Sequence, residues 1–420
     1  GARGGPSDAR ALVPVLLDIA TLVTGRMPRG PGHLDLVRDA AIAWQGDRIA
    51  WVGPAGELPA VFAREERHSA GGGLVIPGLV DCHTHLAFGG WRADEFEARI
   101  RGETYLEIAA RGGGIRSTVA QTRAATREEL RERCNDHLAR MARLGVTTVE
   151  AKSGYGLTLE HELGLLELYR ELRESSAQRI VATLLAAHVV PPEFQDRRAD
   201  YVELVAGQLI PQVGARALAQ FCDAFVEEGA FSIAEARRIL LAGQAHGLLP
   251  KRHADRPTSG GGAELAAEVG AASADHLECI SDAGVRQMAA AGVVAVSLPF
   301  ASLYLGVAPL PARRLLAAGV PVAVATDFNP GSAPSYHLPV AMTLACTMQR
   351  MTPAEVLHGA TAVAARALAL GGVTGSVVPG LSADFAVLEA ESVNHWLYHL
   401  RENACVLTVA RGRVVWRATA

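Results

Sequence analysis

The stretch VIPGLVDCHTHLAFGGWRADEF, from Val75 to Phe96, decides the fold class, because an apolar run ends here in two histidines one residue apart. Side chains at positions i and i+2 of a strand point to the same side. His83 and His85 can therefore face one centre, with Thr84 turned away. A lone His-x-His pair is weak evidence for a metal site, since many such pairs arise by chance or are hydrogen-bonded at a surface. Its meaning depends on the rest of the chain.

The region from Pro77 to about Leu370 alternates between apolar strand-like runs and Ala-, Leu- and Arg-rich helical runs. Examples are VTTVEAKSG, LEHELGLLELYRELRES, RIVATLLAAHVVP and an amphipathic stretch from Arg216 to Glu227. Repeated alternation of this kind predicts a parallel sheet flanked by helices. The length suits a TIM-like (β/α)8 barrel, which typically takes ~250 residues plus insertions.

The two ends of the chain predict strands instead. ALVPVLLDIATLVTG (11–25) and AAIAWQGDRIAWVG (40–53) precede the barrel region, and GSVVPGLSADFAVLEA (375–390) and NACVLTVARGRVVWRA (403–418) follow it. We expect them to pair as one small β-sandwich domain beside the barrel. The predicted division is 1–76 and 371–420 for the two parts of the β domain and 77–370 for the α/β barrel.

Composition excludes several classes of protein. The 420 residues are 49% apolar with a formal net charge of -4, so no basic excess points to nucleic acid. No uninterrupted apolar run reaches the roughly 18 residues of a membrane helix, and the first ten residues lack the apolar region of a signal peptide. The six cysteines are scattered without a CxxC pair, which is typical of reduced thiols. We therefore expect a cytoplasmic protein that binds neither nucleic acid nor membrane.

Polar residues stand where apolar runs stop, which is where barrel enzymes carry their catalytic groups. They are His83 and His85 after GLVIPGLVD, His188 in ATLLAAH, His253 after GLLPKR, His276 in GAASADH and Asp327 in GVPVAVATD. Imidazoles plus one carboxylate, with a position left open to water, suit Zn²⁺ or Fe²⁺. The alternative is a set of buried histidines that cap strand ends through hydrogen bonds. The number of strand-end residues in one α/β pattern favours the metal centre.

The chain resembles the metal-dependent amidohydrolase superfamily and, within it, the imidazolonepropionase family. The matching segments lie between Pro77 and Ala367: PGLVDCHTHLAFGG, RADEFEARIRGETYLEIAARGGGI, TTVEAKSGYGL, AAHVVPPEF, SADHLE and ATDFNPGS. The Ser-Gly-Tyr-Gly and Asp-Phe-Asn-Pro-Gly runs are specific to the family, whereas His-x-His is specific only to the superfamily. The resemblance implies hydrolysis of the cyclic amide C–N bond of 4-imidazolone-5-propanoate, giving N-formimino-L-glutamate in histidine degradation.

The resemblance also implies the site residues. It places one transition metal ion, Zn or Fe, on His83, His85, His253 and Asp327, with His276 and Asp327 as catalytic groups. It implies substrate binding by Arg92 and Tyr155 at the propionate, by His188 and Asn329 at the ring, by the Gly331 and Ser332 backbone, and by Arg256. A guanidinium suits a carboxylate because it presents a planar fork of donors. We expect a homodimer.

Three positions raise questions. Arg256 stands where the family is expected to have Gln or Glu, and a guanidinium cannot accept a hydrogen bond from a ring N–H. Phe300 stands where a Gly is expected, which would narrow the pocket. Lys152 could be the carboxylated lysine that bridges two metal ions in some relatives, but His253 and Asp327 complete a single centre without it.

Purely structural roles are the alternative for three of the proposed substrate-binding residues. Arg92 could pair with Asp94 or Glu95 at the surface, Tyr155 could be a turn residue, and Asn329 could only form a turn before Pro330.

Two other functions are alternatives to hydrolysis of the imidazolone. The first is another cyclic amidohydrolase, or a deaminase of a ring base, on the same barrel. Arg92 and Tyr155 argue against a deaminase, because a neutral base needs no carboxylate clamp. The second is a non-catalytic barrel that serves as a scaffold, and the complete set of metal ligands argues against it.

Overall fold

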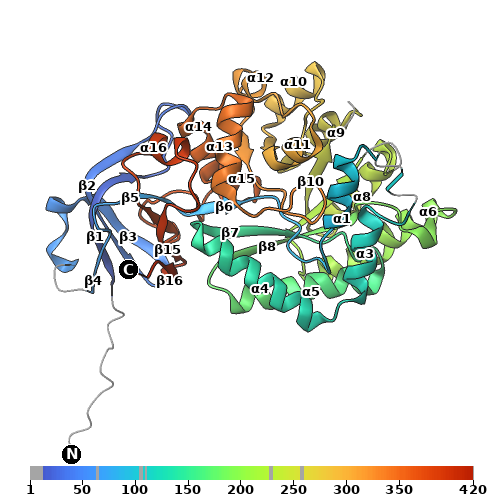
Figure 1. Ribbon diagram of the computed structural model, residues 1–420, viewed down its shortest axis with the longest axis horizontal. Helices are drawn as coiled ribbons and strands as arrows, with labels where there is room; N and C mark the ends of the chain where they lie inside the picture. The colour runs from blue at the N-terminus through green and yellow to red at the C-terminus, as the bar shows by residue number, and fades with distance from the viewer. Residues whose placement is uncertain are drawn as a thin grey trace, which may run out of the picture.

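The computed structural model describes residues 13–62, 66–103, 107–108, 111–226, 230–255 and 260–419. Its strands form two separate sheets, each with eight strands. In Figure 1 the N-terminal and C-terminal segments lie side by side in one sheet, at the opposite end of the molecule from most barrel helices. Among the described residues, no helix is long and apolar enough to cross a membrane, and the six cysteines form no disulfide.

The central sheet is a parallel barrel in which strand order follows chain order. Its strands are β6 (Leu79–Asp81), β7 (Val146–Lys152), β8 (Arg179–Ala187), β9 (Phe221–Phe225), β10 (Leu249–Ala254), β11 (Ser273–His276), β12 (Val294–Ser297) and β13 (Val322–Val324). All seven residues of β7 are buried, as expected for a strand covered on both faces. The predicted eight-stranded α/β barrel is confirmed.

Helices follow every barrel strand. They are α1 (Ala93–Ile100), α3 (Ile115–Ala124) and α4 (Arg127–Arg143) after β6; α5 (Leu159–Ser175) after β7; α6 (Arg198–Leu204) and α7 (Ile210–Ala215) after β8; α8 (Ile233–Ala245) after β9; α9 (Gly262–Glu268) after β10; α10 (Asp282–Ala291) after β11; α11 (Pro299–Leu305) and α12 (Ala312–Ala317) after β12; and α13 (Leu338–Gln349), α14 (Pro353–Gly359) and α15 (Ala362–Ala367) after β13. Three of these helices begin with a capping box, for example α4 with Thr126 and Glu129.

The barrel closes between the segments that follow β6 and β13. The Asp327 N–H donates to the His83 carbonyl at 3.0 Å, and the His85 N–H donates to the Phe328 carbonyl at 2.8 Å. Thr84 and Phe328 form a parallel bridge there. The backbone contacts that close the barrel therefore also bring the His-x-His pair and Asp327 together.

The second sheet combines both ends of the chain. Its main order is β16 (Arg413–Arg417), β15 (Cys405–Ala410), β14 (Phe385–Leu388), β5 (Leu74–Pro77), β1 (Val15–Val23), β2 (Leu36–Gln45) and β3 (Arg48–Pro54), with β4 (Arg67–Ser69) on β1. The sheet folds over an apolar core that includes Leu16, Ile42, Phe385 and Val409, so the predicted small sandwich is one folded sheet. Trp44 Nε1 donates to the Gly412 carbonyl at 3.0 Å, which ties its two ends together.

The C-terminal segment also contains the short helix α16 (Val393–Tyr398), which the strand pattern did not predict. Short 3-10 turns cover Ala55–Glu57, Ala60–Phe62 and Pro192–Phe194, and one π turn, Val205–Leu209, joins α6 to α7. The chain passes from the small sheet to the barrel between Pro77, the last residue of β5, and Leu79, the first of β6. The predicted domain boundaries at 76/77 and 370/371 stay a prediction.

Candidate active site

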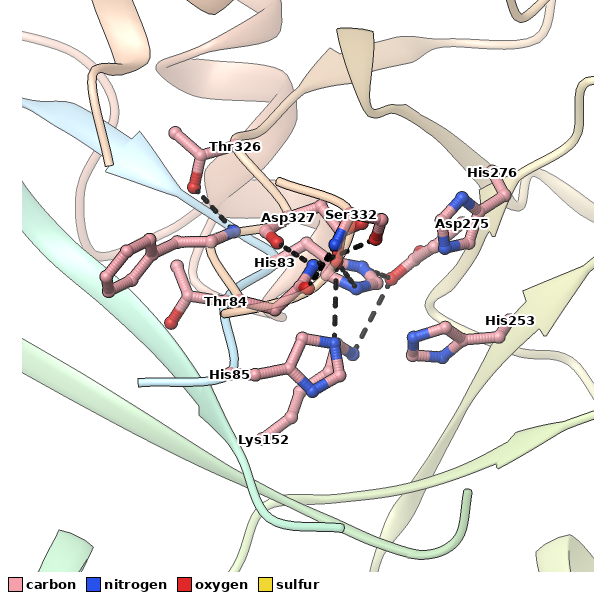
Figure 2. A network of polar contacts seen from close by, with 12 residues as sticks. His83, Thr84, His85, Lys152, His253, Asp275, His276, Thr326, Asp327 and Ser332 are labelled. Atoms are coloured by element: carbon pink, nitrogen blue, oxygen red, sulfur yellow. Dashed lines mark hydrogen bonds and ion pairs between the residues drawn. The ribbon is translucent and has the colours of Figure 1, made fainter. Parts of the chain in front are cut away.

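Three of the predicted metal ligands meet where the barrel closes. His83 Nε2 lies 3.3 Å and His85 Nε2 3.5 Å from the same oxygen, Asp327 Oδ1. Thr84 turns the other way, and its Oγ1 donates to the Glu150 carbonyl at 2.6 Å. Figure 2 shows the two imidazoles directed toward Asp327. The i, i+2 alternation expected from the sequence is thus present in the structure.

Two further histidines join the cluster from β10 and β11. The His83 and His253 rings lie 4.6 Å apart, and the His253 and His276 rings 5.4 Å apart, measured between centroids. Ligand atoms of His83, His85 and Asp327, and likewise of His83, His253 and His276, all lie within 4.8 Å of one another. The cluster therefore offers a set of nitrogen and carboxylate ligands that could hold one metal ion.

The unused nitrogens of this cluster fit a metal ion. His85 Nδ1 and His253 Nε2 are buried and have no hydrogen-bond partner among the described residues, and His83 Nε2 contacts Asp327 Oδ1 at 3.3 Å. A buried polar atom without a partner costs on the order of 1–3 kcal/mol. Unpartnered nitrogens in a cluster that also holds a carboxylate make sense if a cation accepts their lone pairs.

Carboxylates behind the histidines fix their orientation. Asp275 Oδ2 accepts from His83 Nδ1 at 2.6 Å, and Asp223 Oδ2 accepts from His253 Nδ1 at 2.9 Å. With Nδ1 as the donor, each imidazole presents Nε2 to the centre of the cluster. Carboxylates in this position orient metal-binding histidines and raise their basicity.

The electrostatics of the cluster favour a bound cation. Burial and Lys152 lower the pKa of His83, but hydrogen bonds with Asp275 and Asp327 outweigh them and raise it to about 9. Burial lowers the pKa of His253 to about 3, so its ring is neutral and free to act as a ligand. Burial raises the pKa of Asp327, yet His83 and His85 hold it well below the ordinary value.

A buried charge network lies beneath the cluster. Lys152 Nζ contacts Asp223 Oδ2 at 2.8 Å, Glu150 Oε1 at 3.0 Å and Asp275 Oδ2 at 3.5 Å, and Lys251 Nζ lies 2.9 Å from Glu150 Oε2. Burial lowers the pKa of Lys152, but these carboxylates raise it well above the ordinary value. Lys152 is thus a buried cation held among carboxylates, which disfavours the carboxylated lysine of a two-metal site.

The backbone is strained at two of the polar residues of the site, His276 and Asp327. His276 has φ +79° and Asp327 has φ +56°, in the left-handed region that residues other than glycine rarely adopt. Such strain costs of order 1–3 kcal/mol and concentrates at functional sites. Both residues lie at the carboxyl end of a barrel strand, where the chain turns sharply to present them.

Tyr155 and His188 extend the site from the carboxyl ends of β7 and β8. The His188 ring stacks on His85 at 5.2 Å between centroids, and the Tyr155 ring lies 5.6 Å from His85. Burial raises the pKa of the Tyr155 hydroxyl, and the Arg92 guanidinium is near enough to oppose this. Burial and the neighbouring His85 and His253 lower the pKa of His188 well below its ordinary value.

Arg92 packs against the loop that follows Asp327. Its Nη2 occupies the place where a Cβ on Gly331 would stand, so only glycine lets the guanidinium lie there. Arg92 Nε is buried without a hydrogen-bond partner among the described residues, and Glu95 Oε2 lies 3.8 Å from it. Arg92 is therefore not only a surface partner of Glu95.

Asn329 uses its amide to shape this loop. Its Oδ1 accepts from the Gly331 N–H at 2.8 Å and the Ser332 N–H at 2.9 Å, while Nδ2 donates to the Asp327 carbonyl at 2.6 Å. The turn-forming role considered for Asn329 is thus present. Arg256 lies outside the described residues, so its contacts stay a prediction, and Phe300 is buried in α11.

Sequence reasoning missed the supporting carboxylates and one lysine: Glu150, Asp223, Asp275 and Lys251. A signal for them existed, because charged residues recur at i, i+2 spacing inside otherwise apolar strands, as in VEAK and KRH. Buried strands rarely carry charges unless these are paired. The pairing partners come from neighbouring strands and could not be read from one strand alone.

Comparisons with known proteins show the family of this chain. A model of the amidohydrolase family matches residues 74–415. An imidazolonepropionase of Geobacillus thermodenitrificans is 46% identical over 386 residues, 91% of each chain, and one of Anaeromyxobacter dehalogenans is 46% identical over 406 residues, 96% of each chain. Among solved structures, E. coli guanine deaminase matches with a TM-score of 0.74 at 17% identity, covering 96% of this chain and 100% of that one, which shows a shared fold.

Proposed function

The chain belongs to the amidohydrolase family and, within it, to the imidazolonepropionases, and from this premise we propose the reaction and the roles of its residues. The reaction is hydrolysis of 4-imidazolone-5-propanoate to N-formimino-L-glutamate. Water adds to the ring carbonyl carbon, the cyclic amide C–N bond breaks, and the ring nitrogen leaves with a proton. One carboxylate is formed.

The observation that supports this proposal best is the position of Arg92 and Tyr155 beside the histidine cluster. Arg92 lies against Gly331 in the loop after Asp327, and Tyr155 packs on His85. A guanidinium and a phenol hydroxyl are suitable partners for a carboxylate. The site thus combines hydrolytic ligands with a place for the propionate, which a deaminase of a neutral ring base does not need.

We assign the metal to His83, His85, His253 and Asp327, with His253 held by Asp223. A bound divalent ion lowers the pKa of a coordinated water toward ~7 and polarises a carbonyl. Zn or Fe both suit the imidazole and carboxylate ligands. The unpartnered His253 Nε2 and the contacts of His83 Nε2 and His85 Nε2 with Asp327 Oδ1 support this assignment.

We assign the proton transfers to Asp327 and His276. Asp327 Oδ1 already lies between His83 and His85, so it can accept the proton of the attacking water. The His276 ring lies 5.7 Å from the His83 ring and 5.4 Å from the His253 ring, where it can stabilise the carbonyl oxygen or donate a proton. His188 contacts the ring, and the Asn329, Gly331 and Ser332 loop closes the pocket.

The test is incubation of the purified, metal-loaded chain with 4-imidazolone-5-propanoate, followed by loss of the ring's ultraviolet absorbance. Guanine is the comparison substrate. We expect absorbance loss only with the imidazolone. Turnover of guanine instead would favour the deaminase reading, and turnover of neither compound by the metal-loaded chain would favour the scaffold.

We further propose that the protein works in the cytoplasm as a homodimer. The lack of a disulfide among the six cysteines, all of which lie in the described residues, supports a reducing compartment. Light scattering on the purified chain tests the dimer, and a mass of one chain at micromolar concentration would contradict it.

A further inference from the structure

A buried carboxylate holds the loop that carries Tyr155. Glu162, in the first turn of α5, has no exposed surface. Its Oε1 accepts from the N–H groups of Gly154 at 3.1 Å, Gly156 at 2.8 Å and Leu157 at 2.9 Å. Three backbone donors on one carboxylate oxygen fix the path of a short loop more tightly than its own residues could.

Two residues of this loop have positive φ angles. Gly154 has φ +103°, and a Cβ there would stand 2.8 Å from the Leu185 carbonyl oxygen and 3.0 Å from His188 Nδ1. Leu157 also lies in the left-handed region, with φ +53°. Glycine adopts such a φ readily, whereas the left-handed conformation of Leu157 is strained, and the bond from the Leu157 N–H to Glu162 offsets that strain.

The same loop orients two side chains of the site. Tyr155 lies between Gly154 and Gly156, and its ring is 5.5 Å from the His188 ring. The Gly154 carbonyl is 3.1 Å from His188 Nδ1. A carbonyl only accepts, so His188 Nδ1 carries the proton and Nε2 keeps its lone pair.

We propose that Glu162 is a positioning residue that fixes the 153–157 loop, and through Gly154 selects the Nδ1–H form of His188, so that His188 Nε2 accepts a hydrogen bond from a ring N–H of the substrate. This inference rests on the proposed function and adds a determinant of specificity. The site then prefers a ring that presents an N–H donor to His188, with its carboxylate reaching Tyr155 and Arg92. A ring with an N-methyl group at that place is rejected.

The experiment compares Glu162→Gln with Glu160→Gln, an exposed position in the same helix turn. Glutamine can keep the acceptor oxygen, but it loses the negative charge and places an NH₂ group where Oε2 now accepts from the Gly154 N–H at 3.2 Å. We expect kcat/KM on 4-imidazolone-5-propanoate to fall about 10- to 100-fold in Glu162→Gln. Metal content should equal that of the parent, because the Glu162 carboxylate bonds to the backbone of the loop and, among the described residues, to none of the proposed metal ligands. Glu160→Gln should match the parent.

A double-mutant cycle separates positioning from a general loss of stability. Against a Tyr155→Phe background, Glu162→Gln should cost much less than in the parent, since both changes disturb one unit. Full additivity, or a lower melting temperature with unchanged KM and kcat of the folded fraction, would overturn the inference. If Glu162→Gln does not fold, Glu162→Asp, which keeps the charge and shortens the side chain, replaces it under the same criteria.

Failure of the inference about Glu162 can be distinguished from failure of the proposed function. If the parent does not turn over the imidazolone, the proposed reaction is wrong. If the parent is active and discriminates against the N-methylated ring no better than Glu162→Gln does, the proposed reaction stands and the role of Glu162 is wrong.

Discussion

Replacement of Asp223 by asparagine tests whether the charge network beneath the site supports the metal. Asp223 Oδ2 lies 2.9 Å from His253 Nδ1 and 2.8 Å from Lys152 Nζ, and Oδ1 accepts the His253 N–H at 3.1 Å. Three donors thus converge on one carboxylate. Asparagine has one acceptor oxygen, so its NH₂ group must face His253 or Lys152, both of which are donors there.

The expected effect is a weaker metal site rather than a missing one. Loss of a carboxylate that orients a metal-binding histidine typically costs 10- to 100-fold in metal affinity, which is about 1.4–2.8 kcal/mol. Zinc binding is measured by equilibrium against a chelator of known affinity, with Asp200→Asn as the control because Asp200 is exposed on α6. If Asp223→Asn binds zinc as tightly as the control, the network does not support the site.

Three further predictions follow from single contacts. Arg92→Ala should raise KM about 10- to 100-fold for the propionate substrate, since a charge-assisted bond is lost; an unchanged preference for acidic over neutral ring analogues in steady-state kinetics would contradict the clamp. Gly331→Ala should have a similar effect by displacing Arg92, whereas Gly372→Ala, with open space around its Cβ, should leave KM unchanged. Hydrogen bonds with Arg198 and Ser232 lower the pKa of Glu235 from 4.5 to about 2, so its stabilisation is present above pH 4.5 and lost as the pH falls toward 2. Glu235→Gln should therefore lower the free energy of unfolding by about 1 kcal/mol at neutral pH, with the difference shrinking below pH 4.5 in chemical denaturation; a constant difference down to pH 2 would contradict this.

The residues predicted best from the sequence are those whose geometry is local. His83 and His85 share a side because strand alternation decides it, and His253, His276 and Asp327 lie at strand ends where the barrel pattern places them. The pattern of alternating runs likewise predicted the barrel. The two ends of the chain are predicted to pair because both have strand patterns, one before the alternating barrel region and one after it.

The residues that sequence reasoning missed depend on distant partners. Asp223 lies in a stretch that reads as amphipathic, and only the pairing of β9 with β10 brings it beside His253. Glu162 looks like an ordinary acidic residue in the first turn of a helix, which is a favourable place for it. Its role appears only when α5 packs against the turn before it. Alternation and spacing carry no information on such contacts.

The position of ¹⁸O in the product tests the proposed hydrolysis of the cyclic amide bond. The metal-loaded chain is incubated with 4-imidazolone-5-propanoate in ¹⁸O-enriched water, and the product is analysed by mass spectrometry. We expect ring opening to N-formimino-L-glutamate with one ¹⁸O atom, carried by the newly formed carboxylate, because water adds to the ring carbonyl carbon as the C–N bond breaks. An intact ring, or ¹⁸O anywhere other than that carboxylate, would contradict the proposed hydrolysis.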